Sequence, residues 1–241
     1  MGSASEYKRE RPNNTPRVMA CETGVNRYAW GSCIFEMGNT RVHCTAAVTG
    51  DLPRWRKESG EGWVTAEYRM LPHSTHTRSR REGGSLKGRT SEIQRLIGRS
   101  LRAAVDMKRL GPWQITIDCD VLQADGGTRT ASINGGYIAM VLAMKRMVAE
   151  GCIEALPLIN SIAAVSVGIV DGEVMSDLCY EEDFAAAVDL NLVMTGDGRL
   201  VEVQGTAEEE PFSIDELGAL IRVGQPAIEQ VTAMQKEMTE G

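Results

Sequence analysis

Hydrophobic and polar residues alternate along several short segments that are bounded by turn residues. The alternation predicts a first hairpin in which residues 32–37 pair with 40–48 through a Gly38-Asn39 turn. Two later hairpins are expected, one joining 162–170 to 173–178 and one joining 188–194 to 199–203. Between the first two hairpins, residues 114–122 read as a strand with its apolar side chains on one face.

Apolar residues recur every three or four positions in three other segments, which is typical of helices packed on a core. The first helix is expected at 91–110, starting with a Ser91/Gln94 capping box, and the second at 130–150. A third begins at Ser213 and is expected to kink or break at Pro226. Because strands come as hairpins and helices fall between them, the pattern indicates an α+β fold and not a doubly wound sheet.

The domain organisation expected from the sequence is simple. Residues 24–241 read as one compact domain, and residues 1–23 as an N-terminal arm that is partly flexible or, at its start, a remnant of cloning. The composition, with 42% hydrophobic residues and no long apolar segment, is that of a globular protein without a membrane span. Six scattered cysteines with no C-x-x-C pair predict reduced thiols in the cytoplasm.

The net charge of −7 hides a strongly uneven distribution. Residues 54–109 contain fourteen bases and six acids, so this segment carries +8 and the remainder −15. Part of the excess lies in a segment expected to be an exposed loop, with Arg78, Arg80 and Arg81, and part on the polar face of the helix that follows it, with Arg95, Arg99 and Arg102. Such a ridge can bind nucleic-acid phosphates without reading bases, although a solvated face or a subunit contact explains it equally well.

The turn between the strand at 114–122 and the second helix has the composition of an anion site. Gly126 and Gly127 allow successive N–H groups to face one anion, Thr128 offers a hydroxyl, and Arg129 offers parallel donors at the start of the helix. The simpler alternative is an ordinary turn capped by Thr128 or Thr130. Since the helix dipole disfavours a cation at this end, Arg129 favours a bound anion.

Further along the chain, Asp177 and Asp183 lie at and just beyond a predicted strand end. Two converging carboxylates there can hold Mg²⁺ or act on a leaving oxygen, which is the chemistry that phosphoryl transfer needs. The alternative is a solvated acidic turn in an acidic half of the chain.

Much of the sequence from about Gly24 onward resembles the bacterial ribonuclease PH family. The resemblance is carried by residues 62–68, 89–103 and 118–131 and continues at 177–180, 182–183, 204–208 and 211–213. It implies a two-layer fold of mixed sheets and packed helices. It also implies a phosphate-dependent 3′→5′ exoribonuclease that trims precursor tRNA, releases nucleoside diphosphates and can add nucleotides in reverse.

The resemblance also implies roles for individual residues. The phosphate co-substrate is expected at Arg89, Gly127, Thr128 and Arg129. Asp177, Asp183 and Arg129 are expected to be catalytic, with a divalent metal, Mg²⁺, at the two aspartates. The loop from Arg78 to Arg81 is expected to help hold tRNA, and the chain to assemble as a hexameric ring in the cytoplasm. Arg95 and Arg99, on the helix that follows the loop, are expected to bind RNA as well.

Several positions depart from the family pattern. Arg11-Pro12-Asn13-Asn14-Thr15 replaces an R-P-D-G-R segment, and Phe184 is expected to crowd the acidic pair where a serine is common. Two other functions fit the same fold: a non-catalytic RNA-binding subunit of an exosome-like ring, and a hydrolase that releases nucleoside monophosphates.

Overall fold

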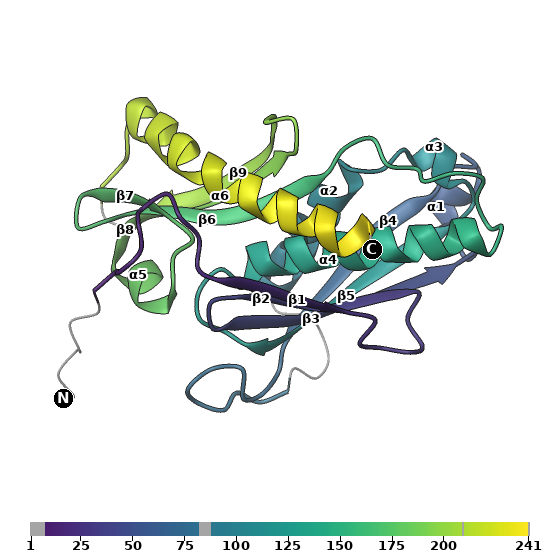
Figure 1. Ribbon diagram of the computed structural model, residues 1–241, viewed down its shortest axis with the longest axis horizontal. Coiled ribbons are helices and arrows are strands. Elements are labelled where there is room, and N and C mark those ends of the chain that lie inside the picture. The colour runs from purple at the N-terminus through teal and green to yellow at the C-terminus, as the bar shows by residue number, and fades with distance from the viewer. Residues whose placement is uncertain (1–7, 82–87, 209, 241) are drawn as a thin grey trace.

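Two β-sheets form the framework, one from each half of the chain (Figure 1). The computed structural model describes residues 8–81, 88–208 and 210–240, so the start of the expected arm and the Gly83-Gly84-Ser85 end of the basic loop lie outside the described residues. In the first sheet the strand order is β1-β2-β3-β5-β4. Its strands are β1 (Met19–Thr23), β2 (Gly31–Met37), β3 (Thr40–Thr49), β4 (Trp63–Met70) and β5 (Gln114–Gln123).

The second sheet has the strand order β7-β6-β8-β9 and is antiparallel throughout. Its strands are β6 (Ile162–Val170), β7 (Glu173–Ser176), β8 (Ala186–Thr195) and β9 (Leu200–Ala207). In the first sheet only β4 and β5 pair in parallel. The mixture of antiparallel hairpins and intervening helices confirms the α+β class predicted from the sequence.

Three long helices cover the sheets (Figure 1). Helices α2 (Gly88–Arg102) and α4 (Thr128–Ala149) pack on the first sheet, and α6 (Ile214–Glu240) packs on β6, β7 and α4. Helix α4 also contacts β6, so it lies between the two sheets, which explains why its apolar residues are not confined to one stripe. The short helices are α1 (Arg54–Lys57), α3 (Met107–Leu110) and α5 (Tyr180–Ala185).

A buried amide joins the two halves of the core. Asn134 of α4 donates to the Ala164 carbonyl at 2.9 Å and accepts from the Ala164 N–H at 2.8 Å. Both polar groups of this side chain are therefore satisfied inside the core, and the pair fixes how β6 lies on α4.

The helices differ from the sequence prediction at their ends. Helix α2 begins at Gly88 and stops at Arg102, because Asp106 starts a new helix by accepting from the N–H groups of Lys108 and Arg109 at 3.0 and 3.1 Å. The helix predicted as continuous to residue 110 is therefore two helices. Conversely, α6 runs through Pro226 without the break that was expected there. Among the described residues, no helix combines the length and apolar character needed to cross a membrane.

The described part of the expected N-terminal arm, residues 8–23, is bound to the rest of the protein. Residues 19–23 form the edge strand β1, and the segment before it runs along the second sheet. Arg9 and Arg11 form ion pairs with the buried carboxylate of Glu182 at 2.9 and 3.2 Å. Burial by itself would raise the pKa of Glu182, but the Cys179 N–H and the arginines outweigh it and lower that pKa.

Candidate functional site

The turn before α4 has the geometry of an anion site. Gly126 and Gly127 both adopt left-handed φ angles, 71° and 63°, which residues with a Cβ rarely reach. Gly127 is the N-cap of α4 and offers no side chain to its first N–H groups. These N–H groups and the positive end of the helix dipole therefore stay open to an anion, as the glycine pair predicts.

Two arginines stand beside this turn. Arg129 is in the first turn of α4 and Arg89 is in the first turn of α2, so each occupies a helix start, where the helix dipole disfavours a cation unless an anion balances its charge. Tyr68, at the end of β4, connects to the same place because its hydroxyl lies 2.9 Å from the Thr128 hydroxyl. Burial raises the pKa of Tyr68, whereas Thr128, Arg89 and Arg129 act to lower it. The four residues expected to bind phosphate, Arg89, Gly127, Thr128 and Arg129, thus lie together.

Two buried polar atoms at this site have no partner within the described part of the chain. They are Nε of Arg129 and Oε1 of Gln204, which comes from β9. Both side chains reach Glu92: Arg129 Nη2 lies 3.8 Å from it, and Gln204 Nε2 donates to it at 2.9 Å. Buried donors and acceptors are rarely left unpaired, so these atoms are available to a polar ligand.

Asp183 and Asp189 are the carboxylates that face the arginines. Burial raises the pKa of Asp183, against the lowering effect of Arg129 and Arg89. Burial, reinforced by the charge of Asp183, raises the pKa of Asp189 to about 6. Glu208 adds to both shifts. The site therefore combines two arginines with two interacting carboxylates, a pattern that marks functional sites.

Asp177 occupies a different position from the one the sequence suggested. Its side chain is fully buried, and its two carboxylate oxygens accept from Arg17 Nε at 2.9 Å and Arg17 Nη2 at 2.7 Å. The Arg17 backbone N–H adds a third bond at 2.6 Å. These bonds engage both oxygens from inside the fold, so the structure does not bring the Asp177 carboxylate together with Asp183, as the sequence suggested; the carboxylate that interacts with Asp183 is Asp189.

The sequence analysis missed Asp189 although a signal was present. This aspartate lies in β8 among buried apolar side chains, next to Val188 and Leu190. A carboxylate inside an apolar strand needs a partner or a ligand.

Phe184 does not crowd the acidic pair. Its side chain is 82% exposed and stacks on Tyr180 of the same helix, with ring centroids 6.2 Å apart. The crowding expected from the sequence is therefore wrong, since Phe184 points outward from α5.

The predicted basic ridge is only partly available to a ligand. Arg78, Arg80, Arg81 and Arg95 are exposed. Arg99, in contrast, forms a two-point ion pair with Glu202 of β9, at 3.1 and 2.5 Å. Arg102 donates to the Val64 carbonyl at 2.9 Å and lies over the Trp63 ring. The basic loop thus has free guanidinium surface, whereas the C-terminal end of α2 uses its arginines to hold neighbouring elements.

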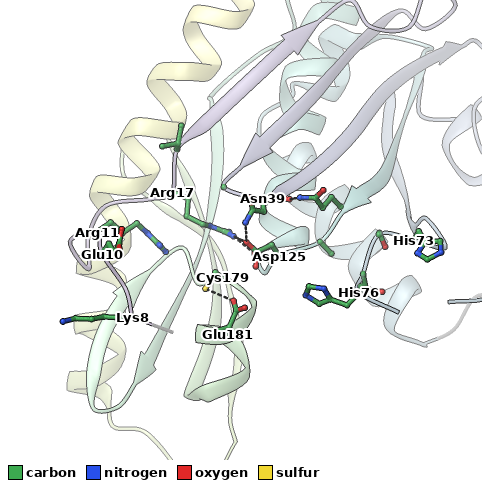
Figure 2. Close-up of a pocket in the computed structure, with 16 residues that line it drawn as sticks. Lys8, Glu10, Arg11, Arg17, Asn39, His73, His76, Asp125, Cys179 and Glu181 are labelled. Atoms are coloured by element: carbon green, nitrogen blue, oxygen red, sulfur yellow. Dashed lines mark hydrogen bonds and ion pairs between the residues drawn. The ribbon is translucent and has the colours of Figure 1, made fainter. Parts of the chain in front are cut away.

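A cavity of about 890 Å³ opens beside the turn before α4, where Asp125 and Arg17 line it (Figure 2). Within the described ranges, one group of potential metal ligands lies here, Asp125, Cys179 and Glu181, with ligand atoms within 4.8 Å of one another. Asp125 is already engaged, because it accepts from Asn39 and the Tyr180 N–H and pairs with Arg17. These contacts make it a structural link between the first sheet and α5.

The carboxylates at the arginine site suit the metal that the resemblance implies. Mg²⁺ prefers hard oxygen ligands and commonly takes one or two carboxylates together with phosphate oxygens. Asp183 and Asp189 offer such oxygens beside Arg89 and Arg129, whereas Asp177 does not, because Arg17 uses both of its oxygens.

Comparison with known proteins agrees with this description of the fold. Residues 15–145 match the first domain of the 3′ exoribonuclease family, described as RNase PH, and residues 160–226 match the second. The chain is therefore a member of the RNase PH family of 3′ exoribonucleases. The two matches divide it at about the point where the first sheet ends and the second begins.

Solved structures share the whole fold. Rice (Oryza sativa) Rrp46 superposes with a TM-score of 0.76 at 17% identity, covering 94% of this chain and 97% of that one. A chain of the Archaeoglobus fulgidus exosome with RNA bound to the active site superposes with a TM-score of 0.78 at 20% identity, covering 93% and 90%. The RNase PH-type fold expected from the resemblance is thus confirmed.

Proposed function

We propose that this protein is a phosphate-dependent 3′→5′ exoribonuclease of the bacterial ribonuclease PH kind, which shortens RNA 3′ ends and releases nucleoside diphosphates. The observation that carries the proposal is the position of Asp183 and Asp189 opposite Arg89, at the start of α2, and Arg129, at the start of α4. Such an arrangement would put an anion site on one side of the reacting centre and the acid pair, Asp183 and Asp189, on the other.

Inorganic phosphate is the nucleophile in this proposal. Arg129, Arg89 and the open N–H groups after Gly127 bind it, and their positive charge opposes the negative charge that grows on the reacting phosphoryl group. The unpaired Nε of Arg129 gives this residue a further donor for a phosphate oxygen. A phosphate oxygen forms a bond to the terminal phosphorus while the bond from that phosphorus to the preceding 3′ oxygen breaks.

The acid pair acts on the departing 3′ oxygen, which gains a proton as its bond to phosphorus breaks. The raised pKa of Asp183 and the value of about 6 at Asp189 allow one carboxyl of the pair to hold that proton near neutral pH. Mg²⁺ held by the carboxylate oxygens would supply positive charge at the same centre. The products are a nucleoside diphosphate and an RNA one nucleotide shorter.

Precursor tRNA is the proposed substrate, and the exposed loop arginines Arg78, Arg80 and Arg81 are proposed to hold its backbone. A homohexameric ring would place several such loops around one RNA. The six cysteines are unpaired, which agrees with the cytoplasm as the proposed location.

The decisive experiment measures the products formed from a tRNA with a short 3′ extension, with and without inorganic phosphate. Nucleoside diphosphates that appear only with phosphate support the proposal, and monophosphates formed without it would indicate a hydrolase instead. Asp189→Asn should abolish turnover while RNA binding persists. Asp215→Asn, an exposed carboxylate at the start of α6, serves as the matched control.

A non-catalytic RNA-binding subunit is the second candidate, favoured by the similarity to a chain of the Archaeoglobus fulgidus exosome. The acid pair and both arginines argue against it, because a subunit without chemistry has no need of two interacting carboxylates opposite two arginines. RNA binding with no product under any phosphate or metal condition would establish this alternative.

A further inference from the structure

Three aromatic side chains form a row that runs from the cavity in Figure 2 to the residue next to Asp183. Tyr180 and Phe184 lie one turn apart on α5, 50% and 82% exposed, with their rings stacked at an interplanar angle of 29°. His76, from the loop after β4, meets Tyr180 edge to face with centroids 6.3 Å apart. We call His76, Tyr180 and Phe184 the aromatic row.

The exposure of this row is not explained by folding. Burying a Phe side chain contributes about 1.5–3 kcal/mol, and an exposed Phe forgoes that gain. Aromatic rings turned to solvent beside a binding site commonly mark an interaction surface. The aromatic row therefore calls for a ligand with flat apolar faces.

The row connects two parts of the RNA site. At one end, Asp183 of the acid pair directly precedes Phe184 in α5. At the other end, His76 projects into the cavity from the loop that continues to Arg78, Arg80 and Arg81 (Figure 2). A strand held by the loop arginines would pass the three rings before its end reaches the acid pair.

We propose that the aromatic row is a stacking platform for the unpaired bases near the 3′ end of the RNA, which lines up the last nucleotides for cleavage. Helix α5 presents Glu181 and Asp183 beside the rings, so it repels phosphates and favours contact through bases. Stacking accepts any base, as removal of successive nucleotides requires. The inference rests on the proposed function only in taking RNA as the partner.

The test is an RNA-binding measurement with chelator and without phosphate, so that turnover does not enter. The probe is a hairpin RNA with a short unpaired 3′ segment and a 5′ fluorophore. Phe184→Leu and Tyr180→Leu keep apolar bulk but remove the ring, and each should weaken binding by about fivefold or more. Tyr28→Leu is the matched control, because Tyr28 is 85% exposed on the β1–β2 connection and should bind as the wild type does.

A second probe carries abasic sugars in the 3′ segment and so keeps its phosphates. The wild type should bind it more weakly, whereas Phe184→Leu should show little further loss, because the stacking partner is already absent. If Phe184→Leu lost affinity equally for the base-containing and the abasic RNA, or lost none for either, the proposed stacking platform would be wrong. Since Phe184 is so exposed, its variant should keep the wild-type melting temperature; an unfolded Tyr180→Leu would leave Phe184→Leu to decide.

The outcomes separate this inference from the proposed function. Base-dependent binding without phosphate-dependent products would retain the platform and reject the exonuclease. Phosphate-dependent release of nucleoside diphosphates, together with unchanged RNA binding by Phe184→Leu, would retain the exonuclease and reject the platform. If Phe184→Leu instead lowered the mass of the assembly in sedimentation, the aromatic row would be a contact between protein copies and the proposal would be wrong.

Discussion

Arg17 and Asp177 form a buried two-point ion pair next to the turn before α4, with Nη2 to Oδ1 at 2.7 Å and Nε to Oδ2 at 2.9 Å. The same guanidinium donates to the Asp125 carbonyl and, at 3.5 Å, to the Gly126 carbonyl. Arg17 precedes β1, and Asp177 follows β7. The pair therefore ties the N-terminal segment, the second sheet and the turn before α4 together at one point.

Asp177→Asn should destabilise the protein. Removing one charge of a buried pair leaves the other without compensation and costs about 3–5 kcal/mol, which urea unfolding would measure. Because the turn loses its support, the KM for phosphate should rise more than kcat falls. An Arg17→Met/Asp177→Leu double variant should be less destabilised than either single change. Loss of kcat at unchanged stability would instead restore Asp177 as a catalytic acid.

Arg129→Ala should lower phosphorolysis by about a hundredfold or more, the usual effect of losing one transition-state donor, about 3–4 kcal/mol. Arg129→Lys keeps the charge but cannot donate two parallel bonds, so it should recover only part of the activity. Steady-state release of nucleoside diphosphate measures both. Arg41→Ala, which removes a partly exposed arginine paired with Glu36 on the first sheet, is the control. Full activity of Arg129→Ala would remove this residue from the phosphate site.

The geometry of the turn before α4 could be predicted because its signal is local. Gly126 and Gly127 need left-handed backbone, and the helix that follows supplies its own dipole, so eight consecutive residues contain most of the information. The hairpins and long helices were predicted for the same reason. Arg89 was found through resemblance, since nothing in its neighbours shows that α2 begins beside α4.

The acid pair could not be predicted in the same way, because it depends on which sheet edge each carboxylate faces. Asp177, Asp183 and Asp189 are spaced six residues apart, and spacing does not distinguish them. The partner that removes Asp177 from the site is Arg17, 160 residues earlier in the chain. Parallel pairing of β4 with β5 was also missed, since it needs the crossover through α2 and α3.

Gly126→Ala should disrupt the conformation of the turn before α4. A Cβ there would meet the Leu178 carbonyl oxygen and lie 2.6 Å from the Cys179 carbonyl carbon, in addition to the strain of a φ of 71°. Gly198→Ala is a control for the strain alone, because Gly198 has a φ of 84° with open space around it. Gly198→Ala should lose about 1 kcal/mol of stability, and Gly126→Ala clearly more. Similar unfolding midpoints for the two variants would show that the turn adapts to the added methyl group.

The pKa of Asp189 predicts how stability depends on pH in the absence of metal. An unfolded aspartate titrates near pH 3.9, whereas burial and Asp183 raise the pKa of Asp189 to about 6 in the folded protein. Between these values the folded state binds more protons than the unfolded state, so stability falls as pH rises from about 4 to 6. Above pH 6 the full loss, on the order of 2–3 kcal/mol, remains.

Asp189→Asn removes this loss and should therefore be more stable than the wild type at about pH 7.5, with the difference shrinking towards pH 4. Urea unfolding in the presence of chelator measures it, with Asp215→Asn as the exposed control. Added Mg²⁺ at pH 7.5 should stabilise the wild type, because a cation between the carboxylates offsets their repulsion, and should stabilise Asp189→Asn much less. A difference between the two proteins that stays constant with pH would mean that Asp189 is ionised throughout, and the acid pair could not hold a proton near neutrality.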